Sequence, residues 1–360
     1  MENHKIRVAI TQGDTNGIGL ELIFKTFAEP EMLELCTPII YGSPKVASYH
    51  SNVLQTQCQF SIISNVKDVR DGKVNLIPCF DEEVKVEFGQ PTNEAAVAGV
   101  KALDRALADS REGRYDVLVC GPMNSGVVQM KPFNFPGTVK YIETSIGEGQ
   151  KAEPIHLNDI LRVALATEGS VKDIALTKEL IVEKVKTLHN SLKRDFNIST
   201  PRIAVLALNP VAGIEEKEII APAITELAES KIQVFGAYQA DEFFSQRKYD
   251  AFDAILAMHH DQGLLPLRML SDSKSTILLA NLPLVCSIVD CDAQHQIAGK
   301  NMADEAILRN AIYVAIDACR NRVHYDEPMQ NPLPKLYHER PDDGEKLRFS
   351  IPKKREQKEN

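Results

Sequence analysis

Short apolar runs alternate with longer amphipathic segments along most of the chain. Short apolar runs bounded by polar residues are typical of buried strands, and apolar residues three or four apart are typical of helices. The segment 92–110 is the clearest helix, because its apolar residues share one face and Thr92 can cap its first turn. The sequence predicts strands at 6–10, 38–41, 117–120, 161–166, 203–208, 233–235 and 254–257, and helices at 20–28, 92–110, 177–196, 215–229 and 303–319.

This alternation of strands and helices predicts an α/β fold with mostly parallel sheets that carry helices on both faces. A chain of 360 residues is long enough for two domains, or for one large domain, with an ample core. From about residue 321 the chain becomes polar and rich in proline. The segment 323–360 is therefore expected to be a tail with little core of its own.

Composition narrows the class of protein. The net charge of −9 argues against a nucleic-acid partner, because an acidic surface repels phosphates. No apolar stretch approaches the roughly 20 residues that span a bilayer, and the N-terminus leads into a strand without a signal peptide. The 7 cysteines contain no C-x-x-C pair, which favours reduced core thiols in a cytoplasmic protein. Acidic pairs such as Glu215 and Glu216 are expected on solvated faces.

Two polar segments that follow predicted strands are candidates for chemistry. The strand at 254–257 runs into His-His-Asp at 259–261, where an α/β enzyme would place a metal ligand or an acid–base pair. The loop at 11–21 carries glycines between the first strand and the first helix, but its spacing is not G-x-G-x-x-G. A structural turn and a ligand loop are both open for it, and Asp14 could face a cleft or cap the helix.

Six short segments together make the chain similar to a known family. They are Gly-Asp-Thr-Asn-Gly-Ile-Gly at 13–19, Gly-Gln-Pro-Thr at 89–92, Phe-Pro-Gly at 135–137, Leu-Asn-Pro-Val-Ala-Gly at 208–213, His-Asp-Gln-Gly-Leu at 260–264 and Ile-Ala-Gly-Lys at 297–300. In this order, and over roughly residues 5 to 322, they resemble the 4-hydroxythreonine-4-phosphate dehydrogenases of pyridoxal phosphate biosynthesis.

The resemblance implies a homodimer with a fold like that of isocitrate and isopropylmalate dehydrogenases, in which two α/β/α lobes flank a cleft. The nucleotide-side lobe would comprise 1–125 and 285–322, and the lobe on the dimer and metal side would comprise 126–284. The family reaction is NAD-dependent oxidation and decarboxylation of 4-phosphooxy-L-threonine, a small phosphorylated metabolite. A divalent metal, held by three histidines from two subunits, polarises the developing carbonyl.

The chain departs from the family at the metal ligands. Thr138 and Val211 stand where the family has two of its metal-binding histidines. Only the third histidine is retained, as His260. A threonine hydroxyl is a poor substitute for imidazole and valine has no donor atom, so we do not expect the family's metal site. Replacement ligands stay open at three other histidines, which are His156, His259 and His295.

The substrate positions are also changed. Asp14, Asp261 and Arg268 occupy cleft positions of the family, and Arg268 stands where the family has a lysine. Ile277 and Cys286 replace an asparagine and an arginine that would hold a charged substrate.

The nucleotide-binding segment is retained at one end only. In the loop 290–296, Asp292 replaces a glycine and adds a side chain where the backbone would approach the cofactor. The family's cofactor-binding positions are expected at Ile297, Gly299, Lys300 and Asp304.

Three interpretations of function follow from these residues, and whether the chain is an enzyme stays open among them. One is an active NAD-dependent dehydrogenase with an altered metal site or substrate. Another is a non-catalytic homologue that keeps the fold and serves as a binding or regulatory partner of an intact paralogue. The third is a metal-independent activity on the same scaffold. The family implies NAD and a divalent metal, but the lost ligands favour a copy without the metal-dependent activity.

Overall fold

The computed structural model describes residues 5–56, 59–80, 83–124, 137–167, 176–271 and 274–330. Short, mostly apolar segments form the strands, and all of them belong to one sheet. The strands are β1 (Arg7–Thr11), β2 (Thr37–Gly42), β3 (Phe60–Ile62), β4 (Val74–Pro78), β5 (Val117–Cys120), β6 (Glu153–Leu157), β7 (Arg162–Leu165), β8 (Arg202–Leu206), β9 (Gln233–Tyr238), β10 (Ala254–Ala257), β11 (Thr276–Ala280) and β12 (Val285–Val289).

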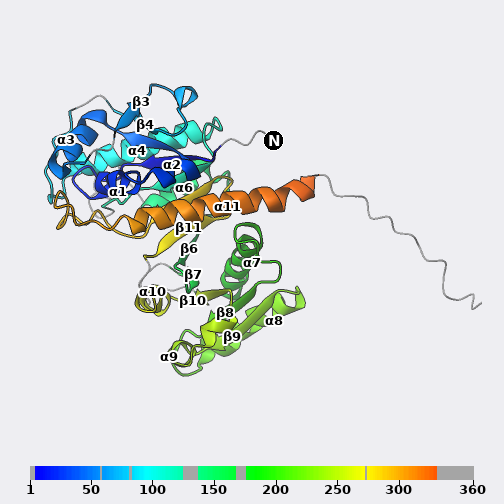
Figure 1. Ribbon diagram of the computed structural model, residues 1–360. Coiled ribbons are helices and arrows are strands. Elements are labelled where there is room, and N and C mark those ends of the chain that lie inside the picture. Colours follow the sequence, from blue (N-terminus) through cyan, green and yellow to red (C-terminus); the bar gives the residue numbers. More distant parts are fainter. Residues whose placement is uncertain are drawn as a thin grey trace, which may run out of the picture.

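The order of strands across the sheet is β3-β4-β2-β1-β5-β12-β11-β6-β7-β10-β8-β9. Pairing is parallel from β3 to β12 and again from β7 to β9, whereas β12, β11, β6 and β7 pair antiparallel with one another. Figure 1 shows the resulting two halves, one around β1 to β5 and one around β7 to β10. The α/β class with a mostly parallel sheet is thus confirmed.

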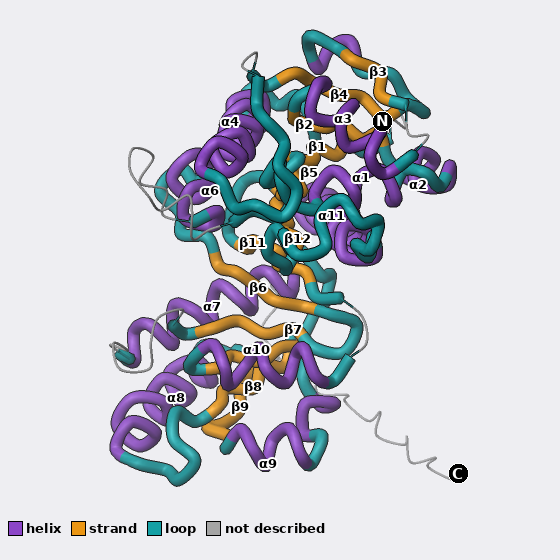
Figure 2. The backbone as a smooth tube through the Cα atoms, turned by 90° about the vertical axis from the view of Figure 1, so that its left-hand side faces the viewer, coloured by secondary structure: helices purple, strands orange, loops and turns teal. Residues whose placement is uncertain are grey.

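Helices cover both faces of the sheet in each half (Figure 2). In the first half, α1, α2, α3 and α11 enclose one apolar cluster and α4 and α6 enclose another. In the second half, α7 and α8 cover one face and α9 and α10 cover the other. The helices are α1 (Gly19–Thr26), α2 (Pro30–Leu35), α3 (Pro44–Leu54), α4 (Asn93–Ser110), α6 (Thr138–Ile146), α7 (Lys178–Arg194), α8 (Ala221–Glu229), α9 (Ala240–Ser245), α10 (His260–Met269) and α11 (Ala306–Gln330), with short turns η1 (Val66–Asp68), η3 (Glu216–Ile220) and η4 (Lys248–Ala251).

Two segments differ from their expected place. The helix α6 was assigned by resemblance to the second lobe, but its Ile142 and Ile146 pack in the same apolar cluster as α4 of the first half. The last helix, α11, continues to Gln330, eleven residues beyond its expected end at 319 and into the expected tail. Residues 331–360 lie outside the described part of the chain. The lobe boundaries at 125/126 and 284/285 stay a prediction.

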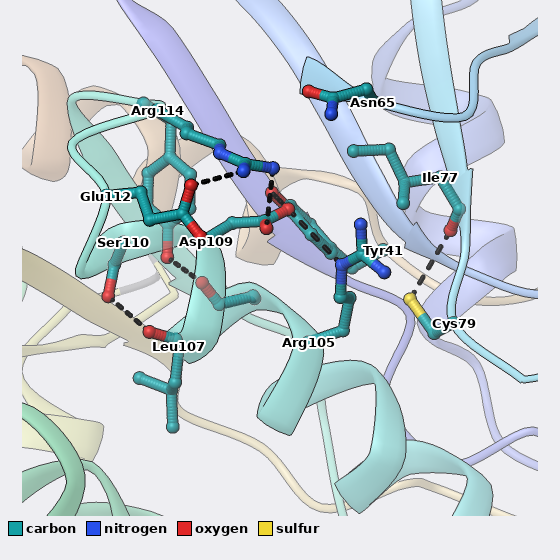
Figure 3. A network of polar contacts seen from close by, with 12 residues as sticks. Tyr41, Asn65, Ile77, Cys79, Arg105, Leu107, Asp109, Ser110, Glu112 and Arg114 are labelled. Atoms are coloured by element: carbon teal, nitrogen blue, oxygen red, sulfur yellow. Dashed lines mark hydrogen bonds and ion pairs between the residues drawn. The ribbon is translucent and has the colours of Figure 1, made fainter. Parts of the chain in front are cut away.

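A buried carboxylate fastens α4 to the sheet of the first half (Figure 3). Asp109, in the last turn of α4, accepts a hydrogen bond of 2.9 Å from the hydroxyl of Tyr41 on β2. Arg114 Nη1 lies 3.2 Å from Asp109 Oδ1, and Arg105 Nε lies 3.5 Å from Oδ2. These partners compensate a negative charge that would otherwise be unfavourable both inside the protein and at a helix C-terminus.

A second buried ion pair joins α11 to the second half. Arg322 Nε donates to Asp195 Oδ1 at 2.6 Å, directly after α7, and Arg322 Nη1 donates to the carbonyl oxygen of Leu282 at 2.9 Å. Both side chains are almost fully buried, at 7% and 2% exposure. One turn further along, Asp326 accepts three hydrogen bonds from Nε and Nη2 of Arg194 in α7. The helix therefore spans both halves and holds α7 against the turn between β11 and β12.

Among the described residues, no helix combines the length and the apolar character needed to cross a membrane.

We expect Arg322→Ala to lower the free energy of unfolding by about 3–5 kcal/mol, because it leaves the Asp195 carboxylate buried without its cation. Urea denaturation followed by circular dichroism measures this loss. The matched control is Arg320→Ala on the same helix, where the arginine is 52% exposed and faces Asp317 at 3.9 Å, and where a change within about 0.5 kcal/mol is expected. Equal effects of the two substitutions would contradict the assigned role of Arg322.

Candidate functional site

A candidate site is a cavity of about 650 Å³ at the carboxyl ends of β5 and β12. Parallel strands that end side by side commonly form the binding crevice of an open α/β sheet. The walls come from the segment after β5, the start of α6, the last turn of α10, the start of β11 and the segment after β12. The lining residues are Gly121, Pro122, Met123, Thr138, Val139, Arg268, Ile277, Ile288, Val289, Asp290, Cys291, Asp292 and Gln294.

One end of this cavity carries a charged cluster around Asp290, whose side chain is 8% exposed. Its Oδ2 accepts a hydrogen bond of 2.6 Å from Ser275 Oγ, and its Oδ1 lies 3.4 Å from Nη2 of Arg268. His156 Nδ1 is 3.9 Å from Oδ2, beyond hydrogen-bond length. Burial opposes ionisation of Asp290, but these three neighbours outweigh it and lower its pKa to about 2. Asp290 is therefore an anion at any physiological pH.

The first predicted ligand position, Thr138, lies at this cavity as the first residue of α6. Gly137 precedes it with φ of 101°, a conformation that favours glycine, and no side chain caps the helix there. The neighbouring wall is apolar, with Met123, Val139 and Ile277. Thr138 thus offers one hydroxyl at an otherwise apolar part of the cavity.

The other two ligand positions lie elsewhere, at the ends of the adjacent strands β8 and β10. Val211 is 75% exposed in the loop after β8. His260 begins α10 with its side chain half exposed, and its Nδ1 lies 2.9 Å from Oδ1 of Asp261. Neither residue lines the cavity. Across the described ranges, no three His, Cys, Asp or Glu side chains gather as a metal site.

The three alternative histidines do not join His260 in the described structure. His156 faces Asp290 at the cavity, as described above. His295 Nε2 lies 3.5 Å from Oδ2 of Asp14 in the first half. His259 is the residue before α10 and makes no side-chain capping hydrogen bond.

The glycine loop at 11–19 is a compact structural connection. Asn16 Nδ2 donates to the carbonyl oxygen of Gln90 at 2.9 Å and to Thr92 Oγ1 at 3.1 Å, so that two of the six family segments bind each other. A Cβ atom at Gly17 would lie 2.6 Å from the carbonyl oxygen of Ala293, and that oxygen accepts a hydrogen bond from the backbone of Ile18. The segment after β12 therefore packs directly on this loop.

Asp14 does not cap the first helix, and its place at a ligand cleft stays a prediction. It is buried at 2% exposure, and its Oδ1 accepts a hydrogen bond of 2.9 Å from the backbone of Asn16 within the loop. Ile18 precedes α1 as its N-cap, without a side-chain hydrogen bond, so Asp14 does not cap this helix. Burial raises the pKa of Asp14, against the lowering effects of Asn16 and His295. Asp14 is absent from the cavity lining.

The four predicted cofactor positions make contacts that support the fold. A Cβ at Gly299, where φ is +75°, would lie 2.8 Å from the ring of Phe88. Asp304 Oδ1 accepts a hydrogen bond from the backbone of Ala306 at the start of α11. Ile297 packs against the first apolar cluster, and Lys300 is exposed. Their role toward a nucleotide stays a prediction.

Glu216 was expected on a solvated face, and this was wrong, because it is only 5% exposed. Its carboxylate accepts hydrogen bonds from the backbone of Asn209 at 2.8 Å and of Gly213 at 2.6 Å. Burial opposes ionisation, but these hydrogen bonds lower the pKa of Glu216 overall. The loop that carries Val211 is thus closed around a carboxylate. The sequence did contain a signal for this contact. It was an acidic residue near the start of the predicted helix, seven positions after Asn209.

Gln262, in the His-Asp-Gln-Gly segment, also has a structural role that sequence reasoning missed. Its Oε1 accepts from the backbone of Met258 at 2.8 Å, and its Nε2 donates to the carbonyl oxygen of Ala207 at 2.6 Å. It therefore connects the ends of β8 and β10. Asp261, the neighbouring cleft candidate, is 87% exposed at the surface of α10. Cys286, which replaces a family arginine, is fully buried in the sheet.

His50 of α3 supports the glycine loop and generates a pH prediction. Its Nε2 donates to the carbonyl oxygen of Thr15 at 2.8 Å, and burial lowers its pKa from 6.5 to about 4. Between these values the unfolded chain binds a proton that the folded chain does not. The contribution of neutral His50 is therefore complete above pH 6.5 and declines by about 3 kcal/mol as the pH falls to 4.

We expect His50→Gln, which keeps an N–H donor but does not titrate, to flatten the decline of unfolding free energy over this pH range. Urea denaturation at a series of pH values measures the slope. The control is His324→Gln, which removes an exposed histidine of α11 and should keep the wild-type slope. An unchanged slope for His50→Gln would show that other groups cause the decline.

The chain is similar in sequence and in fold to known proteins. A model of the family described as the pyridoxal phosphate biosynthetic protein PdxA matches residues 34–315. The 4-hydroxythreonine-4-phosphate dehydrogenase of Bacteroides thetaiotaomicron is 48% identical, over 97% of this chain and 98% of the relative. That of Sulfurihydrogenibium sp. is 31% identical, over 86% of this chain and 98% of the relative. The solved structure of the Klebsiella pneumoniae enzyme of the same name is similar in fold, with a TM-score of 0.75 at 23% identity over 89% of this chain and 99% of that one.

Proposed function

The chain belongs to the family of the pyridoxal phosphate biosynthetic protein PdxA, and from this premise we propose that it binds a small anionic molecule in its cavity without the family's metal-dependent dehydrogenation. The observation that carries the proposal is the chemistry of the three metal-ligand positions. Thr138 and Val211 stand in place of two of the three histidines. A valine side chain has no donor atom at all, and stable zinc sites need three or four converging donors. The residues present do not fit the metal.

The glycine loop at 11–19 does not offer a free cradle for phosphates. A cradle for phosphates needs backbone that is free to approach the ligand. Here the backbone N–H of Ile18 already donates to Ala293 at 3.1 Å, and the space beside Gly17 is taken by Ala293. Asp14 and His295 face each other in the same region. The segment after β12 therefore closes this loop, and a nucleotide would have to bind at the separate positions 297–304.

Anion binding is supported by the charges at the cavity. Arg268 contributes a guanidinium that is 52% exposed, at the position where the family has a lysine. The cavity volume of about 650 Å³ lies within the range of ordinary small-molecule sites. Thr138 adds a hydroxyl that can donate to an anionic oxygen. A phosphorylated metabolite has the size and charge that these groups accept.

A second candidate function is an active dehydrogenase with a changed metal site or substrate. The observation in its favour is the 48% identity, over almost the whole chain, to a relative named as 4-hydroxythreonine-4-phosphate dehydrogenase. The catalytic test separates the two candidates.

We expect no formation of NADH when the purified protein is incubated with 4-hydroxythreonine-4-phosphate, NAD and zinc, magnesium or manganese ions. The reason is that no donor set remains to polarise the substrate carbonyl. Absorbance of NADH gives the rate, and the Bacteroides thetaiotaomicron relative, assayed in parallel, is the positive control. NADH formation that a chelator abolishes would overturn the proposal and establish the second candidate.

We also propose a homodimer. Two apolar side chains on one face of α10, Leu265 and Met269, are 58% and 74% exposed, and they are spaced four residues apart. Exposed apolar pairs of this kind are typical of an interface. Because metal ligation is not needed to cover them, light scattering should give the mass of a dimer both with and without a chelator. A monomer under both conditions would contradict the proposal, and Leu265→Glu with Met269→Lys should weaken the dimer.

A further inference from the structure

Arg268 stands at the cavity with most of its donors unused. A guanidinium has five N–H donors, and the ion pair with Asp290 at 3.4 Å uses one nitrogen, Nη2. In the described part of the chain, Asp290 is the only charged side chain paired with Arg268. An unrestrained arginine at the end of a helix samples many rotamers, and ordering it weakens binding. A group that holds this side chain in one place would therefore strengthen the binding of a ligand.

Asp290 has the rigidity that such a group requires. It follows β12 directly, and its carboxylate is held by Ser275, which begins the approach to β11. His156 lies on the other side, on β6 opposite Ile277 in the sheet. His156 Nδ1 is itself buried and has no hydrogen-bond partner within the described structure. The hydrogen bond from Ser275 thus holds Oδ2 of the carboxylate, while Oδ1 faces the arginine.

The rest of the cavity lining mixes apolar and polar side chains. Met123, Val139, Ile277 and Ile288 are apolar, whereas Thr138 and Gln294 offer polar groups. Among the described lining residues, Arg268 is the one cation, and Asp290 and Asp292 are the carboxylates. A ligand that fits this distribution has an anionic group at the Arg268 end.

We propose that Asp290 is a positioning residue that holds the Arg268 guanidinium toward the cavity, where it binds the phosphate or carboxylate group of a small ligand. The inference rests on the proposed function, since it assumes that the cavity binds an anion. It adds that binding depends on the orientation of Arg268 as well as on its charge. A planar guanidinium binds both oxygens of a phosphate or carboxylate only when its fork is correctly aligned.

Charge and orientation make opposite predictions for one substitution. Asp290→Asn removes a negative charge beside the cavity, so simple electrostatics predicts tighter binding of an anion. If Asp290 orients Arg268, the same substitution weakens binding, because the ion pair that holds the guanidinium is lost. Asp292→Asn is the matched control, since it removes the same charge from the cavity lining at a residue that does not contact Arg268.

Isothermal titration calorimetry with O-phospho-L-threonine, inorganic phosphate and L-threonine tests the proposal on the intact chain. We expect Asp290→Asn to weaken binding of the anion about tenfold and Asp292→Asn to leave it unchanged or to tighten it up to about threefold. Binding of phosphothreonine and phosphate alone assigns the phosphate as the recognised group. Binding of L-threonine as well assigns the carboxylate, and either result is consistent with the proposal.

Different results would contradict the positioning role of Asp290 and the anion site itself. If Asp290→Asn tightens binding as Asp292→Asn does, Asp290 acts through its charge alone and the positioning role is wrong. If Arg268→Gln leaves the affinity unchanged, or if the wild-type protein binds none of the three probes, the proposed anion site itself is wrong. Ser275→Ala keeps both charges and frees only the carboxylate, so it should weaken binding less than Asp290→Asn. Circular dichroism of each variant checks that it is folded.

Discussion

The central constraint in this molecule is the double pairing of β11. This strand bonds antiparallel to β12 on one side and to β6 on the other, so two parallel half-sheets become one continuous sheet. Each buried backbone group of β11 thereby finds a partner, and separating the halves would leave a row of them unpaired. The cavity lies at this junction, with Ile277 from β11 and Ile288 from β12 in its walls. The buried pair of Arg322 and Asp195 fastens the same junction from outside the sheet.

The segments that match the family are mostly those that hold the backbone together. Asn16 connects the glycine loop to the segment 89–92, and Gln262 connects the ends of two neighbouring strands. Side chains with such roles leave buried polar groups unpaired when they are replaced, which is destabilising. Val211, in contrast, is exposed at the tip of a loop, where a substitution has little effect on folding. A scaffold can therefore persist after the residues of its original chemistry have changed.

The parallel half-sheets could be predicted from the sequence because their strands are apolar runs separated by amphipathic helices. The strands at 117–120 and 254–257 and the cap at Thr92 agree with the structure to the residue. Five strands were missed, namely β3, β4, β6, β11 and β12, although the short turn with Asn281 and Pro283 between the last two was a readable hairpin signal. The site was harder to predict. Asp290 and His156 are far apart in sequence, and only the order of strands brings them together.

The enclosed carboxylate of Glu216 has a consequence for where ligands can bind. The amides of residues 209 and 213, at the entrance to the helical segment that starts with η3, are the kind of groups that attract phosphates and other anions. In this protein they are already saturated by an anion that belongs to the chain itself. An external phosphate would have to displace the Glu216 carboxylate from these amides. Because this carboxylate belongs to the chain, its effective concentration at the amides is high and does not depend on the solution. Glu216 thus closes this potential anion site with a carboxylate of the chain itself.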